Sequence, residues 1–232
     1  MIQRFYKEVI VSERDGGWRV LLDGRAIRTP AKAPQILPSA PLAELLAQEW
    51  RAQGEELDPR SFPRRDLADY AIDVIAADQS KAIAALLAYA ETDTLCYRAE
   101  PDEPLWRRQR DLWEPLVTAC EARHTVKFER ISGIVHKPQP ATTLEALKAR
   151  LESLNPFTLA ALTTLASLSA SLIVALAALE PEADPAALFT AANAEEDWQA
   201  ELWGWDYEAE DARKARAETF AMVTEFAAAA RS

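Results

Sequence analysis

Apolar and polar residues alternate along the first 30 positions in the manner of β-strands. Segments 5–11, 18–22 and 25–30 either alternate between apolar and polar side chains or are rich in β-branched and aromatic residues. Asp15-Gly16-Gly17 and Asp23-Gly24 separate these segments, and Asp-Gly pairs favour the tight turns of β-hairpins. The pattern predicts an antiparallel β-meander, followed by a linker with prolines at positions 30, 34, 38 and 41.

From residue 42 onward, apolar residues recur at the 3.6-residue spacing of amphipathic helices. Thr142 and Glu145 have the spacing of a capping box, and Asn155-Pro156 is a favourable helix start. Pro181 and Pro185 end the long apolar helix, and two more helices that meet near Trp203-Gly204 are expected to finish the chain. The expected helices before that point cover residues 42–54, 63–75, 81–89, 104–122, 142–154 and 157–179.

These patterns predict an α+β fold with two parts. Residues 1–40 form a small N-terminal antiparallel β unit, and residues 41–232 form a larger multihelical domain with a short extended insert near 125–136. The 45 alanines and only 6 glycines agree with a mostly helical chain, because alanine has the highest helix propensity.

The stretch 157–179 raises the question of a membrane span. It contains no charged residue, and a span of this length can cross a bilayer. Six of its residues are Ser or Thr and many others are Ala, so it is much less apolar than a leucine-rich span. A buried central helix of a soluble protein is the favoured interpretation, and attachment to a membrane through this stretch is the alternative.

Charge is distributed unevenly along the chain. The net charge is -11, yet residues 151–212 hold 12 acidic residues and no Lys or Arg, so they account for the whole excess. An acidic chain is a poor candidate for binding nucleic acid, which requires clustered basic residues. The acidic segment is either a solvated surface that keeps the protein soluble or a docking surface for a partner. It also contains Trp198, Trp203, Trp205 and Tyr207.

No sequence motif of a nucleophilic, nucleotide-binding or zinc enzyme is present. Cys96 and Cys120 form no CxxC pair, so we expect free thiols in a reducing compartment. The remaining candidate for catalysis is the row Asp66, Asp69 and Asp73, whose spacing places three carboxylates on one helix face, where they could bind magnesium. A solvated or ion-paired face is the simpler interpretation, so no catalytic residue and no metal ligand is assigned.

Several motifs, in order along nearly the whole chain, resemble a family of assembly chaperones for ATP synthase (F-type ATPase). The family occurs in mitochondria and alphaproteobacteria and acts on the alpha subunit of the catalytic head. The motifs are Arg4-Phe5-Tyr6-Lys7, Leu22-Asp23-Gly24-Arg25, Arg28-Thr29-Pro30, Ala47-Gln48-Glu49-Trp50, Thr92-Asp93-Thr94-Leu95-Cys96-Tyr97-Arg98, Gln109 with Trp113, and Gln199 with Trp203-Gly204. One departure is Glu208-Ala209-Glu210-Asp211, where the family often has an acidic residue followed by His-Asp.

The resemblance implies a chaperone rather than an enzyme. Such a protein binds the unassembled alpha subunit transiently, shields the surface that the beta subunit later covers, and is displaced by the beta subunit. It implies no cofactor, no nucleic acid and no membrane insertion, and we expect a monomer when free. Because the family motif begins with no presequence before it, we expect a bacterial cytoplasmic protein, whereas eukaryotic relatives act in the mitochondrial matrix. The expected contact residues are Trp203, Trp205, Glu208, Glu210 and Asp211.

Overall fold

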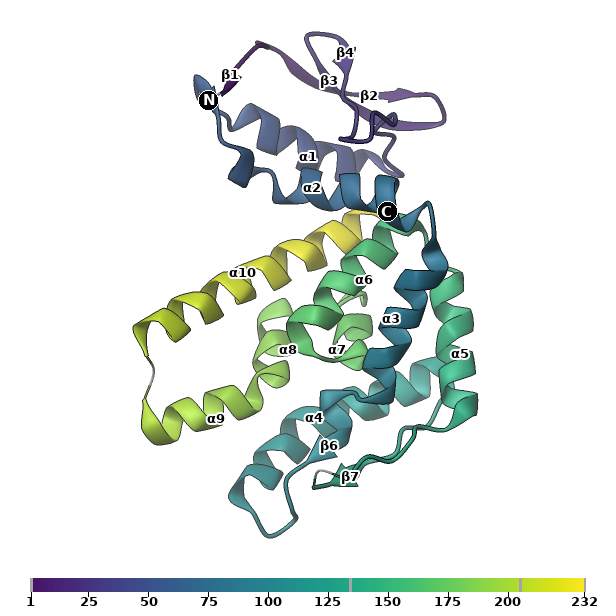
Figure 1. The fold of residues 1–232 in the computed structure, drawn as a ribbon, viewed down its shortest axis with the longest axis vertical. Helices are drawn as coiled ribbons and strands as arrows, with labels where there is room; N and C mark the ends of the chain where they lie inside the picture. Colours follow the sequence, from purple (N-terminus) through teal and green to yellow (C-terminus); the bar gives the residue numbers. More distant parts are fainter. Residues whose placement is uncertain (1, 134, 205, 232) are drawn as a thin grey trace. The chain divides into compact units, whose positions relative to one another are not determined.

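The structure is a computed structural model that describes residues 2–133, 135–204 and 206–231 (Figure 1). The chain divides into two compact units. Unit 1 comprises residues 1–79, 155–161 and 225–232, and unit 2 comprises residues 80–154 and 162–224. Small antiparallel sheets near the N-terminus are followed by many helices, which confirms the predicted α+β class.

The predicted meander is present in unit 1 as an antiparallel sheet of order β2-β3-β4. Its strands are β2 (Val9–Arg14), β3 (Gly17–Leu22) and β4 (Arg25–Ala26), and register pairs Val9 with Leu22 and Leu22 with Arg25. Both turns have two central residues with positive φ: 57° and 79° at Asp15 and Gly16, then 47° and 77° at Asp23 and Gly24. These are the dihedral signs of a type I′ turn, which explains why Asp-Gly stands at both positions.

Helix α1 (Ala40–Arg51) packs against β2 and β3 in unit 1. The Ser39 hydroxyl caps it by accepting a hydrogen bond from the Leu42 N–H at 3.1 Å. Leu42, Leu46 and Trp50 are buried, so the spacing read from the sequence marks the buried face. The predicted change from strands to helices near residue 40 therefore falls inside unit 1.

Unit 1 contains further elements within residues 1–79, besides the segments 155–161 and 225–232. A short strand pair that the sequence pattern did not suggest joins the N-terminus to the segment after α1. Helix α2 begins at Pro63, as predicted, and continues into a single π-helical turn, η2. These elements are β1 (Ile2–Gln3), β5 (Glu56–Leu57), η1 (Pro59–Ser61), α2 (Pro63–Tyr70) and η2 (Ala71–Ile75).

In unit 2, helix α4 contacts α5, α7, α8 and α9, and its Trp113 is fully buried. The Trp113 indole N–H donates to the Ala191 carbonyl on α8 at 2.7 Å. From residue 79 onward the elements are α3 (Gln79–Glu91), η3 (Thr94–Cys96), β6 (Tyr97–Arg98), α4 (Pro104–His124), β7 (Ile131–Ser132), α5 (Ala141–Glu152), α6 (Pro156–Ser169), α7 (Leu172–Ala177), α8 (Pro185–Ala192), α9 (Ala194–Trp203) and α10 (Tyr207–Ala229). Strands β6 and β7 pair in parallel.

The single long helix predicted for residues 157–179 is wrong. Helix α6 ends at Ser169, Ala170 has φ 48°, and α7 starts at Leu172. The break is held by Asp93, whose carboxylate accepts the Ser171 hydroxyl at 2.7 Å and the Ile173 N–H at 2.9 Å. Among the described residues, every helix is too short or too polar to traverse a lipid bilayer.

Two smaller predictions are also wrong. Helix α5 starts at Ala141, so Thr142 does not cap it, and the neighbouring Thr143 hydroxyl donates to the Lys127 carbonyl instead. After Pro185 the described residues form three helices rather than two, because Asn193 ends α8 by donating from its side chain to the Phe189 carbonyl at 2.8 Å. The break between α8 and α9 carries no proline or glycine signal, whereas α5 starts directly after Pro140.

The buried Asp93 makes the stability of the protein depend on pH. Burial raises the pKa of this carboxyl from 3.8 to about 6. Between these pH values the folded state binds more protons than the unfolded state, so the contribution of Asp93 to stability falls as pH rises. We expect the unfolding free energy of the wild type, relative to Asp93→Asn, to fall by about 2 kcal/mol from pH 4 to pH 7.

Urea unfolding followed by circular dichroism at each pH measures this difference. Asp23→Asn is the matched control, because N–H groups of Glu8 and Lys7 hold the pKa of exposed Asp23 below 3.8. The difference in unfolding free energy between wild type and Asp23→Asn is expected to stay nearly constant over pH 4–7. If the unfolding free energies of the two variants, relative to wild type, changed equally with pH, Asp93 would not be the group that causes the pH dependence.

Candidate functional site

Two groups of acidic residues stand out in segment 151–212, and the first group is bound within unit 2. Asp197 on α9 accepts two hydrogen bonds of 2.7 Å from the Arg213 guanidinium on α10. Glu196 accepts from a single guanidinium nitrogen of Arg216, Nη2, which lies 2.8 and 2.6 Å from its two carboxylate oxygens. Glu201 binds Arg108 on α4 at 2.6 Å. These carboxylates fasten α9 to α10 and α4, so they have a structural role despite the acidic composition around them.

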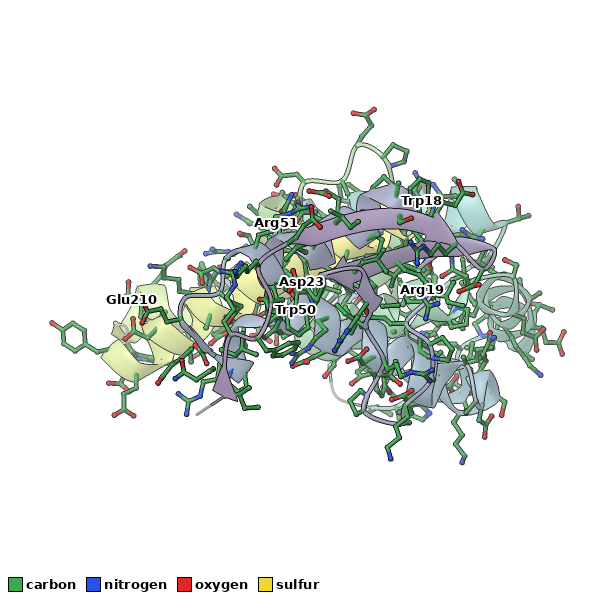
Figure 2. The ribbon with its side chains drawn as sticks, turned by 90° about the horizontal axis from the view of Figure 1, so that it is seen from above. Trp18, Arg19, Asp23, Trp50, Arg51 and Glu210 are labelled. Carbon is green, nitrogen blue, oxygen red and sulfur yellow. The ribbon has the colours of Figure 1, made fainter. Side chains whose placement is uncertain are left out.

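The second group lies where α9 meets α10. Gly204, with φ 85°, follows the last residue of α9, and α10 begins three residues later. Every described residue in 201–212 is exposed. Glu208, Glu210 and Asp211 lie in the first turns of α10, and none of them forms an ion pair with any described residue. Figure 2 shows the Glu210 side chain on the outside of its helix.

Three large apolar side chains are exposed beside these carboxylates. Leu202 is 55% exposed, Trp203 77% and Tyr207 87%. We call the described residues of 202–211 the α9–α10 corner. Acidic residues are favourable in the first turn of a helix, which accounts for Glu208 and Glu210 on stability grounds alone. The helix dipole does not account for the exposed side chains of Trp203 and Tyr207. Exposed aromatic clusters are typical of interaction surfaces.

The structure brings together most of the residues that the sequence singled out. Trp203, Glu208, Glu210 and Asp211 share the α9–α10 corner, whereas Trp205 lies outside the described residues. Leu202 and Tyr207 belong to the corner but were not assigned to the site from sequence. The sequence feature that could have identified them is their position on either side of the helix break at Gly204. Trp198 does not belong, because it is half-buried with the Arg108 guanidinium 5.8 Å from its ring.

The aspartate row does not form a magnesium site. The π-helical turn after Tyr70 changes the helical register between Asp69 and Asp73. Each carboxylate binds a protein group: Asp66 binds Arg65, Asp69 accepts the Gln35 amide at 2.6 Å, and Asp73 accepts the Thr29 hydroxyl at 2.6 Å. In the described part of the chain, no group of three or more His, Cys, Asp or Glu residues could hold a metal ion.

The two cysteines are free and buried in unit 2. Burial raises the pKa of the Cys120 thiol to about 12 and that of the Cys96 thiol well above its usual range. Both thiols therefore stay protonated near neutral pH, so they are poor nucleophiles. Their burial agrees with a packing role, as is common for free cysteines.

The two acidic groups are expected to differ in their effect on stability. Asp197→Ala leaves the half-buried Arg213 without its bidentate partner, so we expect it to lower the unfolding free energy by about 1–3 kcal/mol. Glu210→Ala removes an exposed carboxylate and is expected to change it by less than about 0.5 kcal/mol. Thermal and urea unfolding of both variants measure this. Comparable losses would mean that Glu210 has a structural partner.

The similarity to known proteins extends over most of the chain. A model of the ATP12 chaperone protein family matches residues 3–121. The mitochondrial protein atp12 of Schizosaccharomyces pombe is 27% identical, over 87% of this chain and 74% of its own length. The crystal structure of Atp12 from Paracoccus denitrificans superposes with a TM-score of 0.94 at 36% identity, covering 99% of both chains.

A solved protein structure from Agrobacterium tumefaciens gives a TM-score of 0.92 at 37% identity, covering 98% of this chain and 85% of that one. These matches agree with the motifs recognised in the sequence, from the N-terminal strands to the Trp203-Gly204 pair. The chain therefore belongs to the ATP12 family of chaperones for ATP synthase assembly.

Proposed function

We propose that this protein binds the unassembled alpha subunit of ATP synthase and shields the surface that the beta subunit later covers. The observation that carries the proposal is the α9–α10 corner, where Leu202, Trp203 and Tyr207 are exposed. Beside them lie four carboxylates that have no ion-pair partner in the described chain: Asp206, Glu208, Glu210 and Asp211. A member of an assembly chaperone family needs an exposed surface of this kind, because its client exposes apolar surface until assembly.

The two kinds of side chain at the corner have different roles in the proposal. The aromatic and aliphatic side chains contact apolar surface of the client and supply most of the affinity. Glu208, Glu210 and Asp211 keep this apolar surface hydrated when the protein is free, and they speed encounter with a basic client surface. Trp205, as an expected contact residue, is part of the same proposal. The free protein is proposed to be a monomer and to act in the bacterial cytoplasm.

An aggregation assay of purified alpha subunit tests the proposal. Aggregation of the alpha subunit is followed by light scattering with and without this protein, and the beta subunit is then added. We expect suppression near one-to-one stoichiometry and release of the chaperone on addition of the beta subunit. No suppression, together with no complex on gel filtration, would contradict the proposal.

Variants at the corner separate its two roles. Trp203→Ala is expected to weaken binding by about tenfold or more, as truncation of an interface tryptophan does. The triple variant Glu208→Gln, Glu210→Gln, Asp211→Asn is expected to slow association chiefly at low salt. The control triple variant Glu55→Gln, Asp102→Asn, Glu182→Gln removes the same charge from exposed positions elsewhere. Equal effects of the two triple variants would show that only net charge matters, and the corner would not be the contact.

A further inference from the structure

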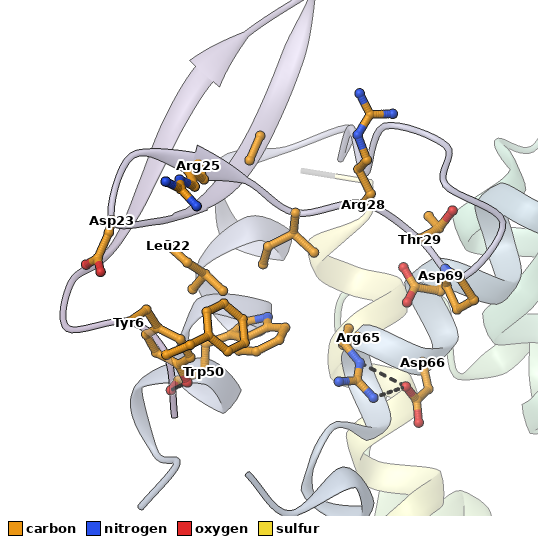
Figure 3. A pocket seen from close by; sticks show the side chains of 14 residues that line it. Tyr6, Leu22, Asp23, Arg25, Arg28, Thr29, Trp50, Arg65, Asp66 and Asp69 are labelled. Carbon is orange, nitrogen blue, oxygen red and sulfur yellow. Dashed lines mark hydrogen bonds and ion pairs between the residues drawn. The ribbon is translucent and has the colours of Figure 1, made fainter. Parts of the chain in front are cut away.

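Unit 1 contains a hollow of about 720 Å³ between β4 with the loop after it and helices α1 and α2 (Figure 3). A volume of this size is in the range of pockets that bind ligands. None of the roles derived above uses it.

The floor of the hollow is aromatic. The rings of Tyr6 and Trp50 meet edge to face with centroids 5.6 Å apart, and Phe5 at the rim is 66% exposed. The Trp50 indole N–H is buried and has no hydrogen-bond partner among the described residues. This floor suits an apolar side chain.

Hydrogen bonds fix each wall of the hollow. The Tyr6 hydroxyl donates to the Trp50 carbonyl at 2.6 Å, which holds the floor against α1. Asp23 accepts the Glu8 N–H at 2.8 Å, which fixes the β3–β4 turn to the segment that carries Tyr6. The Thr29 hydroxyl donates to Asp73 at 2.6 Å, which fixes the loop after β4 to η2. A hollow whose walls are fixed in this way binds with little loss of conformational entropy.

The charged groups around the hollow favour an anionic ligand. Its three carboxylates already bind protein groups: Asp23 binds backbone N–H groups, Asp66 binds Arg65, and Asp69 binds Gln35. By contrast, Arg25 is exposed at the rim, and its guanidinium forms no hydrogen bond or ion pair with any described residue. Arg28 is also exposed, but its guanidinium donates to the Lys32 carbonyl at 2.8 Å. Figure 3 shows Arg25 above the Tyr6–Trp50 floor, whereas the Arg28 side chain extends away from that floor. Guanidinium donors of this kind recognise carboxylates.

The backbone beside the hollow is also available for binding. Strand β4 is at the edge of the β2-β3-β4 sheet, and Arg25 and Ala26 of this strand line the hollow. One row of its N–H and C=O groups faces away from β3, and such an edge accepts an added strand. In an added strand, alternate side chains point to the same face, so an apolar residue and an acidic residue two positions apart would both face the hollow.

We propose that the hollow binds an extended acidic segment of a partner protein, which pairs with β4. An apolar side chain of the segment lies on the Tyr6–Trp50 floor, and a carboxylate two residues away binds Arg25. The site itself does not depend on the function proposed above. Only the identity of the partner rests on that function: if the function holds, the alpha subunit supplies the acidic segment.

The experiment uses the full chain and a fluorescein-labelled peptide, acetyl-Thr-Leu-Thr-Glu-Thr-Leu-Thr-amide, followed by fluorescence anisotropy. A second peptide has Lys in place of Glu. Because the protein carries a net charge of -11, non-specific attraction favours the Lys peptide. We expect the opposite order, with the Glu peptide binding at least about tenfold more tightly, as for a charge-assisted hydrogen bond.

Three variants locate the binding. Arg25→Glu is expected to weaken the Glu peptide by at least about tenfold, and Phe5→Ser, at an exposed position, is expected to weaken both peptides. Arg14→Glu is the matched control: Arg14 is exposed on β2 of the same sheet and does not line the hollow, and the charge change is the same. Arg14→Glu should bind like wild type. Circular dichroism verifies folding, and Arg25→Gln replaces Arg25→Glu if the latter unfolds.

Preference for the Lys peptide, no binding of the Glu peptide, or equal binding to the Arg25→Glu and Arg14→Glu variants would overturn the proposal. The alpha-subunit aggregation assay on the same proteins separates this result from the proposed function. Protection of the alpha subunit without peptide binding rejects the hollow as a site and leaves the proposed function standing. Arg25-dependent peptide binding without protection of the alpha subunit supports the hollow as a site and rejects the proposed function.

Discussion

The fold depends on buried carboxylates that accept backbone N–H groups from other segments. In unit 1, buried Glu49 of α1 accepts the N–H groups of Arg64 and Arg65 at 2.8 and 3.0 Å, so it caps the start of α2. In unit 2, buried Asp93 accepts the N–H groups of Leu95 and Ile173. Each carboxylate supplies the acceptor that a helix start lacks, and its negative charge is favourable at that end of the helix dipole. A buried carboxylate without such donors would be strongly destabilising.

The same requirement divides the acidic residues of this chain by role. Carboxylates that find N–H or guanidinium donors, such as Asp93, Asp197 and Glu196, become part of the scaffold. Those of the α9–α10 corner find no ion-pair partner in the described chain and stay hydrated. Net charge alone therefore says little about an acidic protein. What distinguishes a candidate binding surface here is that unpaired acids lie beside exposed aromatic side chains.

Local chemistry made much of the fold predictable. Asp-Gly pairs gave both hairpin turns, Pro63 gave the start of α2, and the spacing of Leu42, Leu46 and Trp50 gave the buried face of α1. The break between α6 and α7 was not predictable, because the group that holds it, Asp93, is 78 residues away from Ser171 in sequence. The aspartate row misled for a similar reason: its partners Thr29 and Gln35 come from the loop before α1.

The candidate sites illustrate the same limit. The sequence indicated where acidic and aromatic residues are concentrated, but not that Trp198 is half-buried while Trp203 and Tyr207 are exposed. The hollow in unit 1 left no periodic signal, because its lining comes from short pieces of the N-terminal segment, a turn, a loop and two helices. Only the tertiary arrangement brings Arg25 into the neighbourhood of Trp50.

Under the proposed function the incoming subunit displaces the chaperone, which therefore cannot hold its client too tightly. Three exposed apolar side chains at the α9–α10 corner are few compared with the 20–30 residues per partner of a typical stable interface. A second modest contact, such as a strand of the client on β4, would raise the overall affinity, because after the first contact forms the second becomes intramolecular. Each contact could then be replaced separately by the incoming subunit. Two weak contacts on one client thus combine retention with release better than one strong contact does.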